Sequence, residues 1–142
     1  MAADQALSRP VPVVRLIVRN GEGKVLILRR AATAYGEGAW CLPGGKVDYG
    51  ETVEQAVSRE LCEETDLRCS QARFLFHQDS LPPKPGLMHC INLYFECSVS
   101  GHVKINPESS AWAWIRPDEL DRYEIVFRND EALRRYWNER RR

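Results

Sequence analysis

The chain has 142 residues, 44% of them hydrophobic and 28% charged, which is typical of one ordinary globular domain. These values argue against a disordered chain, a collagen and a coiled-coil rod. The 20 Lys and Arg residues balance the 20 Asp and Glu residues, so we expect no stable nucleic-acid complex. No run of 18 apolar residues and no signal-peptide pattern is present, so we expect a cytoplasmic protein without a membrane partner.

The first half of the chain alternates strand and turn signals. We expect a flexible lead over residues 1–12 and a single domain over residues 13–142. Apolar runs predict a hairpin formed by strands at Val13–Val18 and Lys24–Leu28. A short strand at Trp40–Leu42 stops at a Pro-Gly-Gly sequence, and a capping threonine then starts a helix at Val53–Thr65.

The second half predicts three more strands and a final helix. Strand patterns cover Ala72–Gln78, Met88–Val99 and Ala111–Ile115, and a proline-rich loop separates the first two. A short helical turn begins near Asp118, and an amphipathic helix covers Asn129–Arg140. Because strands and helices are interleaved, we expect an α/β layer fold with a mixed sheet.

Three acidic residues share one arc of the first predicted helix. Glu60, Glu63 and Glu64 stand at i, i+3 and i+4, so their like charges oppose one another by about 0.2–0.5 kcal/mol per pair. They also lie in the last turn, where the helix dipole disfavours anions. One interpretation is a hard divalent cation such as Mg²⁺, which prefers carboxylate oxygens. The other is a solvated acidic face in which Arg59 neutralises a neighbour.

The segment before this helix has the glycine spacing of a phosphate-binding loop, but Glu51 replaces the lysine that such a loop needs. Residues 45–67, GKVDYGETVEQAVSRELCEETDL, instead resemble the Nudix box, GX5EX7REUXEEXGU, in which U is aliphatic. Only Asp66 departs, at the glycine position that ends the helix. Asp tolerates the left-handed backbone better than most residues, so we expect a small geometric adjustment.

This resemblance implies a Nudix-type α/β/α sandwich with a mixed central sheet, whose loop–helix–loop binds Mg²⁺ or Mn²⁺. It implies a pyrophosphohydrolase that cleaves the diphosphate linkage of a nucleoside diphosphate joined to another group. Such substrates include nucleoside triphosphates, nucleotide sugars and ADP-ribose-like molecules. The alternative is a non-catalytic Nudix module that binds a nucleotide as a sensor. Loss of box acids would mark that case, and every box acid is present here.

The resemblance also assigns roles within the box. Glu60 and Glu64 correspond to the main metal ligands, Glu63 to a further ligand or water orienter, and the Gly44 carbonyl completes the shell. The residues with supporting roles in the box are Gly45, Glu51 and Arg59. Arg59 would hold Glu51 or Glu60 in its rotamer, and its alternative is an ordinary surface salt bridge.

The proton acceptor and the substrate contacts are less narrowly fixed by the sequence. Glu63 is one candidate base, and Glu108 is the other, since it lies in a loop six residues before Trp114, where Nudix proteins often place an extra acid. The alternative for Glu108 is a solvent-facing loop residue. Glu96 is a weaker third choice.

Three residues outside the box are candidates to contact a small-molecule nucleotide substrate. Arg29 and Arg30, at the end of the second strand, have the chemistry to bind phosphate. Tyr35 has a ring that can stack on a base. The sequence leaves a homodimer open.

Overall fold

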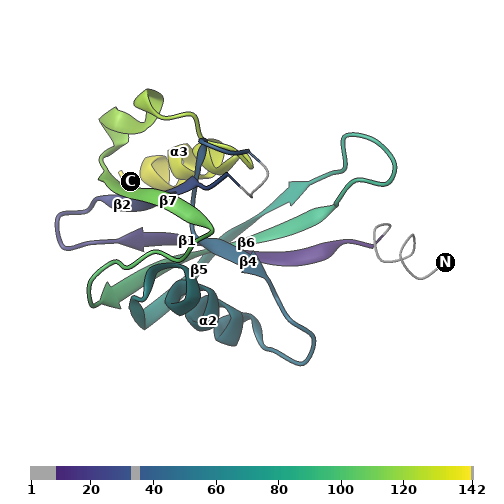
Figure 1. Ribbon diagram of the computed structural model, residues 1–142, viewed down its shortest axis with the longest axis horizontal. Helices are drawn as coiled ribbons and strands as arrows, with labels where there is room; N and C mark the ends of the chain where they lie inside the picture. Colours follow the sequence, from purple (N-terminus) through teal and green to yellow (C-terminus); the bar gives the residue numbers. More distant parts are fainter. Residues whose placement is uncertain (1–8, 33–35, 142) are drawn as a thin grey trace.

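A mixed sheet lies between two helices in the computed structural model of the chain, which describes residues 9–32 and 36–141 (Figure 1). The strands are β1 (Val11–Arg19), β2 (Val25–Arg30), β3 (Trp40–Cys41), β4 (Gly44–Lys46), β5 (Arg68–Ser80), β6 (Cys90–Ser100) and β7 (Ser109–Ile115). The helical elements are α2 (Val53–Thr65), the 3₁₀ helix η1 (Pro117–Arg122) and α3 (Asn129–Arg140).

Strand β1 is central to the sheet. The strand order is β3-β2-β1-β6-β5, with β4 paired to β1 and β7 paired to β2. β1 runs parallel to β6 from the pair Val11–Cys90 to the pair Arg19–Ser98, and the other strand pairs are antiparallel. The predicted mixed sheet is therefore confirmed.

Both predicted α-helices have the bounds that the sequence indicates. α2 begins after Thr52, whose Oγ1 accepts the Gln55 backbone N–H at 3.1 Å, while Gln55 Oε1 accepts the Thr52 N–H at 2.9 Å. This reciprocal capping box satisfies two donors that a helix start leaves open. α2 ends at Asp66, which has the expected left-handed backbone with φ 60°. In the described residues, no helix combines the length and apolarity needed to cross a membrane.

The strands differ more from prediction than the helices do. β5 is 13 residues long and extends beyond Ala72–Gln78 at both ends, because β6 pairs with it over its whole length. Residues 44–46, expected only to end a strand, form β4 and pair with β1. Gly44 makes this possible, since its φ is 153° and a Cβ there would collide with the Val14 carbonyl oxygen.

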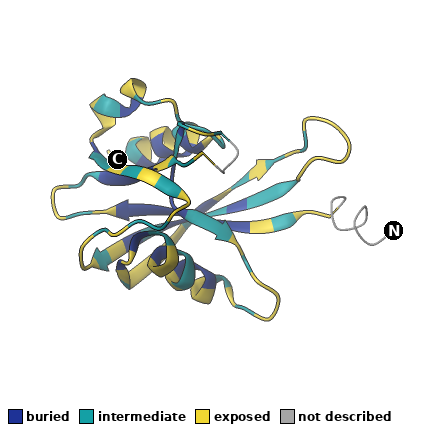
Figure 2. Ribbon diagram, viewed as in Figure 1, coloured by how far each residue is buried: buried dark blue, intermediate teal, exposed yellow. Residues whose placement is uncertain are grey.

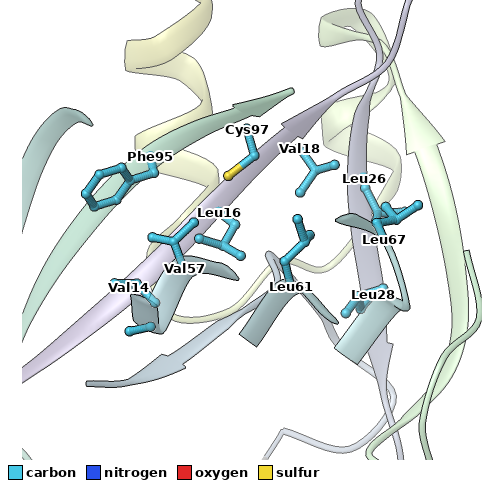
Figure 3. Close-up of a cluster of buried hydrophobic side chains, with 11 residues drawn as sticks. Val14, Leu16, Val18, Leu26, Leu28, Val57, Leu61, Leu67, Phe95 and Cys97 are labelled. Atoms are coloured by element: carbon cyan, nitrogen blue, oxygen red, sulfur yellow. The ribbon is translucent and has the colours of Figure 1, made fainter. Parts of the chain in front are cut away.

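Alternate residues of the central strands supply two separate cores (Figure 2). The core under α2, drawn in Figure 3, includes Val14, Leu16, Val57, Leu61 and Phe95. The core under α3 includes Ile17, Ile27, Tyr94, Leu133 and Tyr136. Burying each large side chain contributes about 1.5–3 kcal/mol, so both helices are fixed to the sheet by apolar burial. The expected α/β/α sandwich is thereby confirmed.

Candidate functional site

Arg59, on α2, is surrounded by carboxylates. Its guanidinium lies 2.6 Å from Glu51, 2.9 Å from Glu60, 3.2 Å from Glu63 and 3.4 Å from Asp48. The Arg59 side chain is only 27% exposed, so this is more than a surface salt bridge. The hydrogen bond from Arg59 lowers the pKa of Glu51 to about 2. Arg59 therefore holds both Glu51 and Glu60 in place, as the box pattern suggests.

Glu60 lies against the backbone of β4. A Cβ on Gly45 would collide with the Glu60 carboxylate, so the glycine lets strand and helix approach closely at this point. Burial raises the pKa of Glu60, the charges of Glu63 and Glu108 add to the rise, and Arg59 opposes it. Glu60 is therefore a partly desolvated carboxylate close to other acids.

Glu64 is anchored on the backbone of β4. Its Oε2 accepts the Gly44 backbone N–H at 2.7 Å. Burial raises the pKa of Glu64 to about 8, with further contributions from the charges of Glu60 and Glu108, against the Gly44 hydrogen bond. At neutral pH this carboxyl is mostly protonated until a positive charge arrives.

The loop between β6 and β7 brings Glu108 to these acids. The Asn106 side chain connects this loop to α2, because its Nδ2 donates to the Glu63 carbonyl at 3.0 Å and its Oδ1 accepts the Glu108 N–H at 2.9 Å. The Glu108 carbonyl also accepts the Ala31 N–H at 3.0 Å. The charge of Glu108 raises the pKa of both buried acids of the helix. Glu108 is exposed, but its backbone N–H and its backbone carbonyl are both hydrogen-bonded.

These acids suit a hard divalent cation in their chemistry. Within residues 9–32 and 36–141, no three His, Cys, Asp or Glu side chains are gathered closely enough to hold a metal ion. Glu60 and Glu64 are held instead by Arg59 and by the Gly44 N–H. Both offer oxygen donors, and both have raised pKa values that a cation would reverse. The donor set therefore fits Mg²⁺ or Mn²⁺.

The predicted substrate contacts lie near the end of β2. Arg29 is exposed, and its Nε donates to the Gly38 carbonyl at 3.3 Å. Arg30 is half-buried, and its Nη1 lies 3.7 Å from Cys41 Sγ. Tyr35 lies outside the described residues. The roles of these three residues stay predictions.

Glu96 does not lie with the other acids. Its Oε2 accepts hydrogen bonds from Tyr136 Oη at 2.5 Å and from Arg140 at 2.7 Å, and its Oε1 lies 3.2 Å from Arg73. These partners fix α3 to the sheet on the face opposite α2. The structure thus gives Glu96 a structural role, and its place as a third candidate base is wrong.

The sequence reasoning did not single out Asn129. This fully buried residue accepts the Leu42 N–H on its Oδ1 at 2.9 Å and donates from Nδ2 to Tyr94 Oη at 3.1 Å. Leu42 lies two residues before Gly44, so Asn129 supports the loop that holds Glu64. An Asn at a helix start is ordinarily interpreted as a cap, which hides this long-range role.

Comparison with known proteins identifies the family. Residues 9–136 match the family model described as NUDIX domain. A MutT-like protein of Streptomyces ambofaciens is 36% identical over 113 residues, covering 78% of this chain and 66% of that protein. Nucleoside triphosphatase NudI of Escherichia coli O139:H28 (strain E24377A / ETEC) is 32% identical over 106 residues, covering 68% of this chain and 75% of that protein.

Solved structures agree with this assignment. The MutT NUDIX hydrolase from Burkholderia pseudomallei has a TM-score of 0.70 at 30% identity, covering 78% of this chain and 86% of that one. The MutT protein from Methanosarcina mazei Go1 has a TM-score of 0.82 at 24% identity, covering 94% of this chain and 96% of that one, and is similar in fold. The chain therefore belongs to the NUDIX domain family and is a Nudix-type hydrolase, an enzyme class that acts on phosphoric anhydride bonds.

Proposed function

We propose that the chain is a Mg²⁺-dependent pyrophosphohydrolase that cleaves the diphosphate linkage of a nucleoside diphosphate joined to another group. The observation that carries this proposal is that the carboxylates of Glu60 and Glu64 are both held against β4, Glu60 beside Gly45 and Arg59, and Glu64 on the Gly44 N–H. Mn²⁺ is an alternative cation of similar ligand preference. Nucleoside triphosphates, nucleotide sugars and ADP-ribose-like molecules are the candidate substrates.

Glu60 and Glu64 are the proposed main ligands of the cation, with Glu63 and the Gly44 carbonyl as further ligands. When bound, a divalent cation acidifies water and neutralises charge on the phosphoryl oxygens. Arg59 acts as a positioning residue, because its guanidinium fixes the rotamer of Glu60 through a 2.9 Å contact. Glu51 supports Arg59 from its other side.

Glu108 is our preferred proton acceptor. Its charge reaches both buried acids, and its loop is fastened to the end of α2 through Asn106. Glu63 is the second candidate, but its carboxylate is already paired with Arg59 at 3.2 Å. A general base that takes a proton from the attacking water is better served by a carboxylate without a competing guanidinium.

A non-catalytic nucleotide sensor is the second candidate function. It would bind a cation and a nucleotide without turnover, and the complete set of box acids speaks against it. The cytoplasmic location stays a prediction, which the five free cysteines support. The homodimer and the single-domain boundaries stay predictions as well.

A substrate panel tests the proposal. The protein is incubated with Mg²⁺ and with ATP, GTP, ADP-ribose or a nucleoside diphosphate sugar, and products are separated by ion-exchange chromatography. We expect cleavage of a phosphoric anhydride bond that stops in EDTA and returns with added Mg²⁺. Binding of Mg²⁺ and nucleotide without any product would contradict the proposal and favour the sensor.

A further inference from the structure

Two arginine side chains meet at one aromatic ring beside the proposed metal site. Cζ of Arg15, in β1, lies 5.1 Å from the centroid of the Phe127 ring, and Cζ of Arg30, at the end of β2, lies 4.8 Å from it. Both distances lie within the range of a cation–π contact. The same ring therefore brings together two guanidinium groups from the neighbouring strands β1 and β2.

Arg15 has no carboxylate partner among the residues that the structure describes, although it is half-buried. Its Nε donates only a long hydrogen bond, 3.4 Å, to the neutral Asn92 Oδ1. Unpaired arginines usually lie in open solvent, because desolvating a charge without a partner costs free energy. A half-buried guanidinium with spare donors is a place for an oxyanion.

The position of Arg15 connects it to the proposed reaction centre. Arg15 is the direct cross-strand neighbour of Gly44, whose N–H binds Glu64. On its other side it is paired with Tyr94 of β6. The Arg15 side chain lies on the α3 face of the sheet, with Phe127, and its charge still reaches Glu64, whose pKa it lowers.

The turn that presents Phe127 is strained and tightly held. Phe127 and Arg128 both have left-handed backbone, with φ 62° and 56°, a conformation that is strained for residues other than glycine. Asn129 Nδ2 donates to the Phe127 carbonyl at 3.3 Å, and Gln78 Nε2 donates to the Arg128 carbonyl at 3.2 Å. Arg128 Nη1 also donates to the Asp79 carbonyl at 2.7 Å. Strain held by this many bonds points to a positioning task.

We propose that Arg15 and Arg30, ordered on Phe127, form a subsite for a phosphoryl group of the substrate beyond the diphosphate bound at the carboxylates. The chain therefore favours nucleoside triphosphates over nucleotides whose second group is an uncharged sugar. The guanidinium fork matches phosphate oxygens with two parallel hydrogen bonds, and partial burial strengthens them. This inference rests on the proposed function, and the first measurement below tests the subsite without turnover.

Binding of inorganic tripolyphosphate is measured by calorimetry in EDTA for the wild type, R15Q and R19Q. Arg19 is the matched control, since it lies on the same strand and on the same side of the sheet, exposed, four residues further on. We expect R15Q to weaken binding at least tenfold and R19Q to change it less than twofold. Equal weakening by both variants would show a general charge effect and overturn the subsite.

Substrate preference is then compared through kcat/KM for ATP and for ADP-ribose, with Mg²⁺. We expect R15Q to lower the ratio of the two values at least tenfold, with R19Q near the wild-type ratio. A ratio that R15Q leaves unchanged overturns the inference. Absence of turnover with both substrates in the wild type would refute the proposed function, while the tripolyphosphate measurement still decides the subsite.

Thermal melting checks that each variant is folded. Should R15Q fail to fold, R15K replaces it, because lysine keeps the charge and the aliphatic stem but loses the planar fork. We then expect at least threefold weaker binding of tripolyphosphate by R15K. Unchanged binding by R15K would count against the bidentate site.

Discussion

Arg59 and Arg15 are both half-buried arginines beside β4, yet the charges around them differ. Arg59 has four carboxylates within 3.4 Å, whereas Arg15 has Asn92, Phe127 and a second arginine nearby. One guanidinium is saturated by the protein itself, and the other keeps donors in reserve. Arg59 therefore orders the carboxylates of the site, whereas Arg15 has donors available for a ligand.

The same contrast holds for the acids around each arginine. Glu51, which accepts hydrogen bonds from Arg59 and from the Asp48 backbone N–H, has its pKa lowered to about 2. Glu64, which lies between Gly44 and the other acids, has its pKa raised to about 8 by burial. The charge of an acid with a lowered pKa is already stabilised by its protein partners, while an acid with a raised pKa gains most from a cation.

Glu64→Gln should lower kcat more than about 100-fold, because loss of a ligand exceeds the 10–100-fold effect of an outer partner. The amide keeps an oxygen to accept the Gly44 N–H, so the melting temperature in EDTA should stay near that of the wild type. Kinetics at saturating Mg²⁺ together with melting curves check both parts. Near-wild-type turnover by this variant would place the reaction elsewhere.

Arg59→Gln should lower the free energy of unfolding by about 1–2 kcal/mol, whereas Arg15→Gln should lower it by less. Breaking a fully buried ion pair costs about 3–5 kcal/mol, and this figure is discounted because the Arg59 side chain is 27% exposed. Urea denaturation in EDTA measures both variants. If Arg15→Gln proved the more destabilising change, the division between the two arginines would be wrong.

Metal-free protein should lose stability as the pH rises from about 4.5 to about 8. The pKa of Glu64 is about 8 in the folded chain, against an ordinary value of 4.5. Between these two values the folded chain keeps a proton that the unfolded chain has released, so folding must take up a proton and becomes less favourable as the pH rises. The slope is at most about 1.4 kcal/mol per pH unit for one group. Glu51, whose pKa is lowered to about 2, acts with the opposite sign and only below pH 4.5.

Urea denaturation at several pH values in EDTA measures this slope, and Glu64→Gln is the matched control that should flatten it. Saturating Mg²⁺ should also flatten it, because a bound cation keeps the carboxylate ionised. A stability that rises with pH in EDTA between 5 and 8 would contradict the assignment of a neutral Glu64.

Asn106→Ala should lower kcat by roughly tenfold or less, as expected for a residue that only orients others. The variant removes the connection between the Glu63 carbonyl and the Glu108 N–H. The pH profile of kcat distinguishes this role from simple structural support, because a displaced Glu108 should shift its acidic limb. A parallel drop at all pH values would indicate loss of folded protein alone.

Local signals explain which parts of the molecule the sequence could predict. The bounds of α2 could be predicted because Thr52 and Asp66 mark its ends, and those of α3 because apolar residues recur with helical spacing. The box acids could be chosen from spacing and resemblance. Strand β4 was missed because three residues containing two glycines carry no strand signal, and only pairing with β1 defines it.

Long-range contacts explain which parts could not be predicted. Arg15 and Asn92 are 77 positions apart, and Leu42 and Asn129 are 87 positions apart. No pattern within either segment reveals that these residues meet, since the contact depends on the parallel pairing of β1 with β6 and on the packing of α3. Asn106 is hidden for the same reason, because its partners lie on a helix and on its own loop.

The Asn129 amide has a consequence for how this enzyme can diversify. Its Oδ1 connects the start of α3 to Leu42, two residues before β4, and its Nδ2 donates to the Phe127 carbonyl. An inserted or deleted residue in the connection over residues 123–128 would disturb both ends at once. Variation in length is better tolerated at the exposed tip over residues 81–87, which has no comparable attachment in the described chain.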